Sequence, residues 1–463
     1  MNTEGRVYDI AIIGGGVTGT AQAYVFTHFV KGISNVLLLE KNENVALVNS
    51  NTDSNAQTLH GGDTETNFSL EKALKMRDAE CILGAFLEKY GEGAYRRLYK
   101  MALAVGADEV RLIKERFKMI HSYYPTLEFL GRESIARIEP KLVEGRNPET
   151  EVAALFRPNG FAVDYHRASE CLYKEAMKSG KLDAFFKTKT RAITRTDGIY
   201  EIETNNAVFH AKAVAVAAGP FSILFAHSCG YAGEYTILPV AGNFYRTRAV
   251  ILGGKVYTVQ DPMFPFAAAH MDSSINDPSA MRIGPTADVI PFLERRHWAT
   301  IADFLKTGVI SKEGLRAIFE IIFRKDEKEE KRKVLRFAGK NVVYKIPVIG
   351  TWYFLKKAAQ KIIPTLRYRD LEFARGEGGV RPQLVNMKTR ALEMGTAKIV
   401  GDRDGDKLVF DITPSPGASD CLRNALVNAK KHFVPFLGSG YEFDDKKFTE
   451  EFPGAREAFG RIA

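Results

Sequence analysis

The sequence is poor in cysteine and has no long apolar run. Its 463 residues include four cysteines, which stand far apart with no C-x-x-C pair. We therefore expect no metal site and no disulfide framework, and this usage fits a reducing compartment. No run of 18 or more apolar residues is present, so no helix is expected to span a bilayer. The N-terminus lacks the basic, apolar and cleavage-site regions of a signal peptide, which indicates a cytoplasmic protein.

Acidic residues are outnumbered by basic ones. Lysine and arginine total 65 against 56 aspartates and glutamates, which gives a formal charge of +9. Such a balance indicates an anionic partner, which is nucleic acid, an acidic membrane or an acidic substrate. The excess is local, because residues 324–369 carry 14 basic and 4 acidic side chains and the rest of the chain sums to about −1.

A glycine-rich turn near the N-terminus lies between a predicted strand and a predicted helix. Residues 7–13 are an apolar run of strand length, residues 14–19 read Gly-Gly-Gly-Val-Thr-Gly, and residues 20–30 form an apolar helical stretch. A second apolar run at 36–39 ends in Glu40. This order of strand, turn, helix and acid predicts a dinucleotide-binding unit, and its place at the start of the chain favours FAD over NAD.

Each part of this unit has a physical task. Gly14 permits the tight turn, Gly16 lets the backbone approach a pyrophosphate, and Gly19 lets the helix pack closely on the strand. The helix N-terminus offers free N–H groups to the phosphates. Glu40, 21 residues past Gly19, is placed to accept the ribose hydroxyls.

Two later segments predict further parts of the same nucleotide site. The first is a meander that ends in small residues around Gly219, with strands expected at 185–191, 199–204, 207–210 and 214–217. Small residues at that strand end would let a flavin nucleotide pass close by.

The second segment is another strand, glycine loop and helix. A strand is expected at 408–412 and a helix reaching to about Leu437. The N-terminus of this helix would stabilise negative charge on a reduced flavin ring. The loop before it supplies the cofactor-contact candidates Gly417, Ala418 and Ser419.

These segments resemble the FAD-dependent malate:quinone oxidoreductases, in the shorter type of that family. The likeness covers nearly the whole chain and is carried by the blocks at residues 55–62, 65–67, 254–260, 266–270, 283–287, 379–383 and 414–419. One departure is the flavin loop, which reads Ser-Asn-Ala-Gln-Thr-Leu-His at 54–60 and lacks the glycine-rich form of the longer type.

The resemblance implies an α/β fold with two interleaved domains. A Rossmann-like FAD-binding domain would be assembled from three chain segments, at residues 1–68, 166–230 and 371–463. An α+β substrate domain would take residues 69–165 and 231–370.

Local patterns refine the expected substrate domain. Residues 69–120 read as mostly helical, with Ser69 starting one helix and Asp108 capping another. Residues 231–290 are rich in aromatic and β-branched side chains with Pro and Gly punctuation, which is typical of a sheet covering the flavin.

Oxidation of a 2-hydroxy acid requires a base for the hydroxyl proton, and histidine is the first candidate because it titrates near neutral pH. The resemblance places a site histidine at His270, at the end of the apolar run 264–269. His60, in the loop expected to touch the flavin ring, is the second candidate. His60 is also a candidate for a covalent flavin link, although we expect noncovalent binding. A lone histidine is more often structural.

The substrate carboxylates require cations, and arginine offers a planar, bidentate group. Arg381 is expected on a loop between a glycine pair and Pro382, where the resemblance implies a carboxylate-binding arginine. Arg282 is the candidate for the second carboxylate. The alternative for Arg381 is a structural ion pair, and the alternative for Arg282 is an ordinary surface charge. Gln57 and Thr58, in the flavin loop, complete the expected cofactor contacts.

The basic segment includes a predicted helix with a mixed surface. Trp352, Leu355, Ala359 and Ile362 fall at helical spacing, while the lysines at 356, 357 and 361 occupy much of the remaining surface. A basic helix with exposed apolar side chains fits an anionic lipid surface. The alternative is a helix packed on the substrate domain, with its lysine stems lying along the surface.

The resulting hypothesis is a peripheral flavoenzyme at the inner face of the cell membrane that oxidises (S)-malate to oxaloacetate and reduces a quinone. A close alternative is the same chemistry on L-lactate or L-2-hydroxyglutarate. An alternative from another class is a nucleic-acid-associated flavoprotein. It is disfavoured, and no nucleic-acid partner is expected, because the basic segment lacks the regular aromatic interleaving of a base-stacking platform.

Overall fold

The computed structural model describes residues 5–260, 268–286, 288–323, 339, 343–344, 346, 348–393, 397–413 and 416–462. Predictions that fall on 261–267, 287, 324–338, 340–342, 345, 347 or 414–415 therefore lie outside the described residues. Within the described part, no helix has the length and apolar character needed to cross a membrane.

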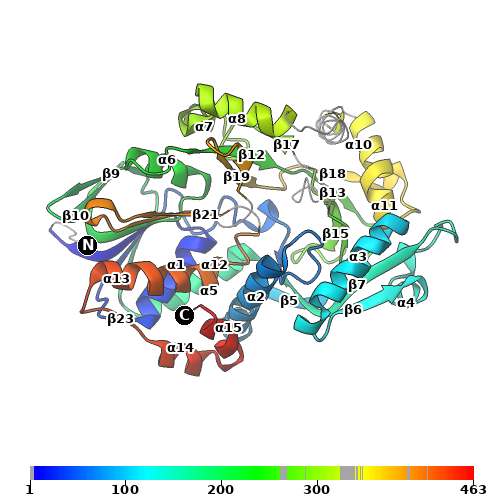
Figure 1. Ribbon diagram of the computed structural model, residues 1–463, viewed down its shortest axis with the longest axis horizontal. Coiled ribbons are helices and arrows are strands. Elements are labelled where there is room, and N and C mark those ends of the chain that lie inside the picture. Colours follow the sequence, from blue (N-terminus) through cyan, green and yellow to red (C-terminus); the bar gives the residue numbers. More distant parts are fainter. Residues whose placement is uncertain are drawn as a thin grey trace.

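The first sheet forms the left side of the molecule in Figure 1. Its strand order is β21-β22-β11-β1-β3-β8, with β10 and β9 added beyond β11, and five of its strands run parallel. The strands are β1 (Val7–Ile13), β3 (Val36–Leu39), β8 (Leu182–Phe185), β9 (Thr190–Thr196), β10 (Ile199–Thr204), β11 (Val208–Val216), β21 (Ala397–Gly401) and β22 (Leu408–Ile412). They come from three separated segments, which confirms the three-part Rossmann-like assembly.

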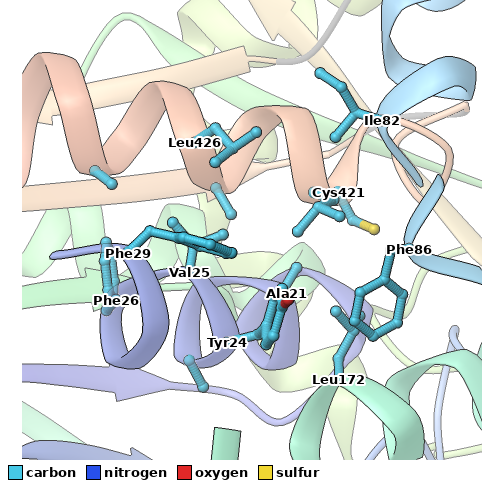
Figure 2. Packing of buried hydrophobic residues seen from close by; sticks show 14 of the residues in the cluster. Ala21, Tyr24, Val25, Phe26, Phe29, Ile82, Phe86, Leu172, Cys421 and Leu426 are labelled. Atoms are coloured by element: carbon cyan, nitrogen blue, oxygen red, sulfur yellow. The ribbon is translucent and has the colours of Figure 1, made fainter. Parts of the chain in front are cut away.

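One side of this sheet is covered by a buried helix that itself has neighbours all round. Helix α1 (Val17–Phe29) packs against α5 (Tyr165–Lys178) and α12 (Cys421–Asn428), and its Tyr24 ring lies 5.1 Å from that of Phe86 on α2 (Leu70–Tyr90). Figure 2 shows side chains of these four helices meeting in one apolar cluster: Ala21, Tyr24, Val25, Phe26, Phe29, Ile82, Phe86, Leu172, Cys421 and Leu426. A helix surrounded in this way is apolar on all faces, which is why its sequence lacks a polar stripe.

A second, nine-stranded sheet forms the right side of the molecule (Figure 1). Its order is β18-β13-β16-β15-β14-β5-β7-β4, with β6 beside β7. The strands are β4 (Thr58–Leu59), β5 (Tyr95–Val105), β6 (Glu128–Gly131), β7 (Val152–Val163), β13 (Phe244–Thr247), β14 (Lys255–Thr258), β15 (His270–Ser273), β16 (Met281–Gly284) and β18 (Glu372–Ala374). Strand β4 carries the flavin loop into this sheet and so joins the two halves of the molecule.

A small third sheet has the order β17-β12-β19-β20. Its strands are β12 (Tyr235–Ala241), β17 (Asp288–Val289), β19 (Val380–Asn386) and β20 (Ala391–Leu392), and a two-stranded ribbon joins β2 (Val30–Lys31) to β23 (Glu442–Phe443). The remaining helices are α3 (Ala107–Ile120), α4 (Arg132–Ile138), α6 (Ser222–Ser228), α7 (Thr300–Phe304), α8 (Lys312–Phe323), α10 (Ile349–Phe354), α11 (Gln360–Ile362), α13 (Val434–Leu437), α14 (Asp445–Glu451) and α15 (Arg456–Gly460).

Several local expectations are confirmed. The strands at 7–13, 36–39 and 408–412 have the predicted bounds, and the final helical stretch reaches Leu437 through a π-helical turn. Ser69 caps α2, because its Oγ accepts a hydrogen bond from the N–H of Lys72. The strands expected across 231–290 are present, but they belong to two sheets: β12 and β17 to the third, and β13 to β16 to the second.

Region 69–120 is mostly helical, as expected, because it holds α2 and α3. Between them lies β5, whose Leu, Met and Ala residues favour a helix but pair with strands on both sides, so tertiary pairing overrides propensity there. Other local expectations are wrong. The strand expected at 185–191 stops at Phe185, and Lys187 has a positive φ of 54°. The two runs at 207–217 form the single strand β11. Gly106 rather than Asp108 caps α3.

The predicted basic helix is present but mostly packed. It runs from α10 through a π-helical turn to α11, and Leu355, Ala359 and Ile362 are buried against the second sheet. For these three side chains the structure agrees with the packed alternative, because their spacing places them on the core-facing side. Trp352 is 53% exposed, and Lys356 and Lys357 are exposed.

Candidate active site

A cavity of about 700 Å³ extends between the first sheet, the flavin loop and β19. It brings together most of the residues predicted from the sequence: Gly14, Gly16, Glu40, Gln57, Thr58, His60, Gly219, Arg381, Gly417, Ala418 and Ser419. Three predicted residues, Gly19, Arg282 and His270, do not line it.

The glycine turn forms one end of the cavity. Gly14 has a φ of 106°, and a Cβ there would lie 2.5 Å from the carbonyl oxygen of Ala217. A Cβ on Gly19 would lie 1.9 Å from the carbonyl oxygen of Gly14, so Gly19 acts behind the turn by permitting close packing. Gly16 precedes α1 and, as a glycine, has no capping side chain of its own, while the N–H of Val17 donates to Ser50 Oγ at 3.0 Å. Gly16, Val17 and Thr18 line the cavity, so the positive end of the helix faces it. This cradle fits a dinucleotide pyrophosphate.

Glu40 lies at the end of β3, beside the glycine turn. Its Oε2 accepts a hydrogen bond of 2.6 Å from the N–H of Gly15, and its Oε1 accepts one from the N–H of Asn42. The carboxylate is therefore fixed at the cavity wall. This is the position in which the sequence predicts a ribose-binding acid.

The flavin loop reaches the second sheet through two fixed side chains. Gln57 is buried with a φ of 50°, its Nε2 donates to the carbonyl oxygen of Thr52, and its Oε1 accepts from the N–H of Ile275. The hydroxyls of Thr58 and Tyr257 form a hydrogen bond of 2.6 Å. Gln57 therefore holds the loop, while Thr58 faces the cavity with Tyr257 behind it.

His60 follows directly in this loop. Its backbone N–H donates to Ser419 Oγ at 3.0 Å, which ties the loop to the segment before α12. Its ring Nδ1 lies 2.6 Å from Glu65 Oε1. A histidine that lines a cavity and contacts a carboxylate has the arrangement of an oriented base.

His270 lies at the first residue of β15, so it begins a strand instead of ending one. It is 4% exposed, and its ring lies 5.0 Å from that of Tyr257. Burial lowers the pKa of His270 to about 3, even though Asp272 is close. The ring is therefore neutral at physiological pH, and His270 does not line the cavity.

Arg282 belongs to a row of buried charges behind His270. Its guanidinium lies 3.1 Å from Asp272 and 3.7 Å from Glu377, and Lys255 lies 3.0 Å from Asp272. Burial alone would raise the pKa of Asp272, but Lys255 and Arg282 lower it to about 2. Carboxylates of the chain itself thus engage Arg282, whose assignment to a substrate carboxylate remains a prediction.

Arg381 lies on β19, a strand and not the loop expected from Gly379 and Pro382. Arg381 pairs with Val240 of the neighbouring strand β12, so the sheet fixes the position of Arg381 at the cavity wall. Burial lowers the pKa of Arg381 to about 10, which leaves the guanidinium charged at neutral pH. The strand therefore presents a cation to the cavity.

The sequence prediction did not assign roles to Tyr257, Glu65, Asp272 or Lys255. Tyr257, Lys255 and Glu65 lie inside blocks that carry the family likeness, which is the available signal for them. Asp272 and Lys255 lie on two neighbouring strands, β15 and β14, and no local spacing pattern predicts that they meet.

Three comparisons with known proteins each match this chain to oxidoreductases over most of its length. The family model described as FAD dependent oxidoreductase matches residues 9–395. The chain is 36% identical to the probable malate:quinone oxidoreductase of Campylobacter jejuni, over 96% of this chain and 98% of that protein. It is 34% identical to the malate:quinone oxidoreductase of Helicobacter pylori, over 94% and 96%. The glycine oxidase of Geobacillus kaustophilus has a similar fold, with a TM-score of 0.62, 16% identity and coverage of 90% and 92%.

Proposed function

Because the chain belongs to the malate:quinone oxidoreductases within the FAD dependent oxidoreductase family, we propose that it oxidises (S)-malate to oxaloacetate and passes the electrons to a membrane quinone. The observation that supports this function best is the shared cavity. A nucleotide cradle, a cavity-lining histidine and a cation on β19 surround one space of about 700 Å³.

FAD is the cofactor of this family. Gly14, Gly16 and the N-terminus of α1 would hold its pyrophosphate, and Glu40 its ribose. When bound, FAD accepts the two electrons that leave the substrate carbon as a hydride. The segment before α12, with Gly417 to Ser419, would lie against the flavin ring and place a helix N-terminus near developing negative charge.

The remaining residues bind the substrate and move its proton. Arg381 would bind a malate carboxylate through charge-assisted hydrogen bonds. His60 lines the cavity and would take the proton of the C2 hydroxyl. His270, the first candidate for the base from sequence, does not line the cavity. We therefore assign it a structural role beside the Tyr257 ring.

We further propose that the protein is cytoplasmic and docks on the inner face of the cell membrane, where a lipid-soluble quinone is reached. The supporting observation is the outer side of α10 and the turn after it. Val348, Ile349 and Trp352 are 67%, 56% and 53% exposed, next to the exposed Lys356 and Lys357. Apolar side chains flanked by lysines fit an anionic lipid surface.

Anaerobic reduction of the flavin tests the proposed chemistry. The purified protein, loaded with FAD, is mixed separately with (S)-malate, L-lactate and L-2-hydroxyglutarate while the flavin absorbance is followed. We expect malate to bleach the flavin fastest. If another 2-hydroxy acid bleaches the flavin faster, that acid is the substrate in place of malate. If none of the three bleaches the flavin, the protein is not a dehydrogenase of these 2-hydroxy acids. A quinone analogue should then reoxidise the flavin.

A further inference from the structure

Glu65 forms a buried pair with the histidine that lines the cavity. Its Oε1 lies 2.6 Å from His60 Nδ1, and Glu65 itself is 4% exposed. His60 borders the cavity, whereas Glu65 does not. Because Nδ1 is turned toward Glu65, Nε2 is the ring nitrogen left for a ligand in the cavity.

The charge state of Glu65 decides which ring nitrogen of His60 carries the proton in the neutral imidazole. Burial alone would raise the pKa of Glu65, but its hydrogen bond with His60 and the charge of Lys100 hold that pKa below the usual value. An ionised carboxylate only accepts hydrogen bonds. The proton between the two residues therefore lies on Nδ1 of His60, and in the neutral form of the ring Nε2 carries the lone pair.

The loop that carries His60 is held at four successive backbone positions. Lys100 Nζ donates to the carbonyl oxygen of Leu59, and Ser419 accepts from the N–H of His60. The hydroxyl of Tyr124 donates to the carbonyl oxygen of Gly61, and Arg116 donates to that of Gly62. So many buried contacts fix the position of the imidazole before any ligand arrives, as preorganised catalytic groups require.

Further buried charges surround the pair. Lys100 lies 3.2 Å from Asp63 and 3.3 Å from Glu80, and Arg157 pairs with both carboxylates. Each of these acids thus has a cation, whereas the Oε2 of Glu65 is buried without a hydrogen-bond partner among the described residues. The charged groups that act on the pair are Asp63, Lys72, Lys100 and Arg116.

We propose that Glu65 is a positioning residue, which holds His60 as the Nδ1–H tautomer so that Nε2 takes the hydroxyl proton of the substrate. This rests on the function proposed above. The O–H bond of the substrate breaks and its proton bonds to Nε2, while the C2–H bond breaks and its electron pair leaves as hydride to FAD, so that a C=O bond forms. The imidazolium that results lies against the Glu65 carboxylate, which stabilises it.

The tautomer is tested directly in the FAD-loaded wild-type protein by ¹⁵N NMR with labelled histidine. The His60 signals are identified by their loss in His60→Gln. We expect Nδ1 to be protonated and Nε2 unprotonated near neutral pH. If the neutral ring is mainly the Nε2–H tautomer, the proposal is overturned. This measurement needs no substrate, so its failure is distinct from a failure of the proposed malate oxidation.

Variants then test the consequence for catalysis. Glu65→Gln removes the charge and allows an amide N–H to face Nδ1, which favours the wrong tautomer. We expect flavin reduction to slow by about 10²- to 10⁴-fold with FAD content unchanged, and Glu65→Asp to recover part of the rate. Glu65→Gln should cost little more in a His60→Gln background. Equal fold-losses in both backgrounds would show that Glu65 does not act through His60.

Glu139→Gln is the matched control. Glu139 is 8% exposed and accepts hydrogen bonds from the hydroxyl of Tyr99 and, at 2.7 Å, from the N–H of Gly253, but it does not line the cavity. We expect the His60 tautomer and the rate of flavin reduction to be unchanged in this variant. A loss matching that of Glu65→Gln would instead indicate a general effect of removing a buried carboxylate, and would overturn the proposal.

Discussion

His270 Nε2 lies 3.6 Å from Asp272 Oδ1, and neither buried atom has a hydrogen-bond partner among the described residues. The two groups face each other at a distance too long for a direct hydrogen bond. Burial keeps His270 neutral, and Lys255 and Arg282 keep Asp272 ionised. His270 is therefore a neutral ring beside an ionised carboxylate, and it lies next to the Tyr257 ring without lining the cavity.

Single substitutions of His60 and His270 should have unequal effects on the rate of flavin reduction. We expect His60→Gln to slow anaerobic flavin reduction by malate about 10²- to 10⁴-fold, because a general base contributes that much. His270→Gln should stay within about tenfold of the wild type, since His270 does not line the cavity. Stopped-flow absorbance measures both rates. A larger loss in His270→Gln would restore His270 as the base.

The buried His270 should also make the fold sensitive to acid. Its pKa is about 3 in the folded chain and about 6.5 when unfolded, so the unfolded state binds more protons between these values. The free energy of unfolding should therefore fall as pH drops from 6.5 toward 3. Groups that act on the ring are Lys255, Asp272, Arg282 and Arg381.

His270→Gln should flatten this dependence by up to about 1.4 kcal/mol per pH unit. Chemical denaturation at pH 6.5, 5.5 and 4.5, followed by flavin and tryptophan fluorescence, measures the slope. His210→Gln, at a partly exposed position on β11, is the control and should leave the slope unchanged. A slope in His270→Gln equal to that of the wild type would contradict the linkage.

Arg381 should govern substrate affinity more than cofactor binding. Removal of a buried cation from a carboxylate costs about 2–5 kcal/mol, so Arg381→Met should lower kcat/KM for malate by at least about 30-fold. Arg381→Lys should recover part of it. Arg375→Met is the control, because Arg375 lines a separate pocket. Steady-state kinetics with a dye acceptor provide the numbers, and an unchanged KM for Arg381→Met would exclude a carboxylate-binding role.

The nucleotide half of the site was predictable from sequence because its parts are local. The turn from Gly14 to Gly19 and the acid at Glu40 keep a fixed spacing along one strand, helix and strand. The half that handles substrate was less predictable. The partner of His60 lies within its own loop, but the ranking of His60 over His270 depends on which ring borders the cavity. Which ring borders the cavity depends on how β4, β14 and β15 pack, and no periodicity in the sequence predicts that packing.

The closest approach in the nucleotide cradle gives a strong steric test. A Cβ on Gly19 would lie 1.9 Å from the carbonyl oxygen of Gly14, which is backbone and cannot move aside cheaply. Gly19→Ala should therefore lose most bound FAD and lower the melting temperature. Gly131→Ala is the control, because nothing lies within 4 Å of its Cβ. The flavin-to-protein absorbance ratio reports the outcome, and full FAD content in Gly19→Ala would contradict the packing argument.

Docking on the membrane should depend on the outer side of α10 and not on its packed side. Lys356→Glu with Lys357→Glu reverses two exposed charges, and Trp352→Ser removes a half-exposed apolar side chain, so the combined variant should bind anionic liposomes at least about tenfold more weakly. Turnover with a membrane quinone should fall with it, whereas turnover with a soluble dye should not, because the cavity is untouched. Lys431→Glu with Lys446→Glu, at exposed positions in the C-terminal helices, is the charge-matched control. If the combined variant and the control weaken liposome binding equally, the effect is one of net charge alone. If the combined variant binds liposomes as the wild type does, α10 and α11 serve only to pack on the second sheet.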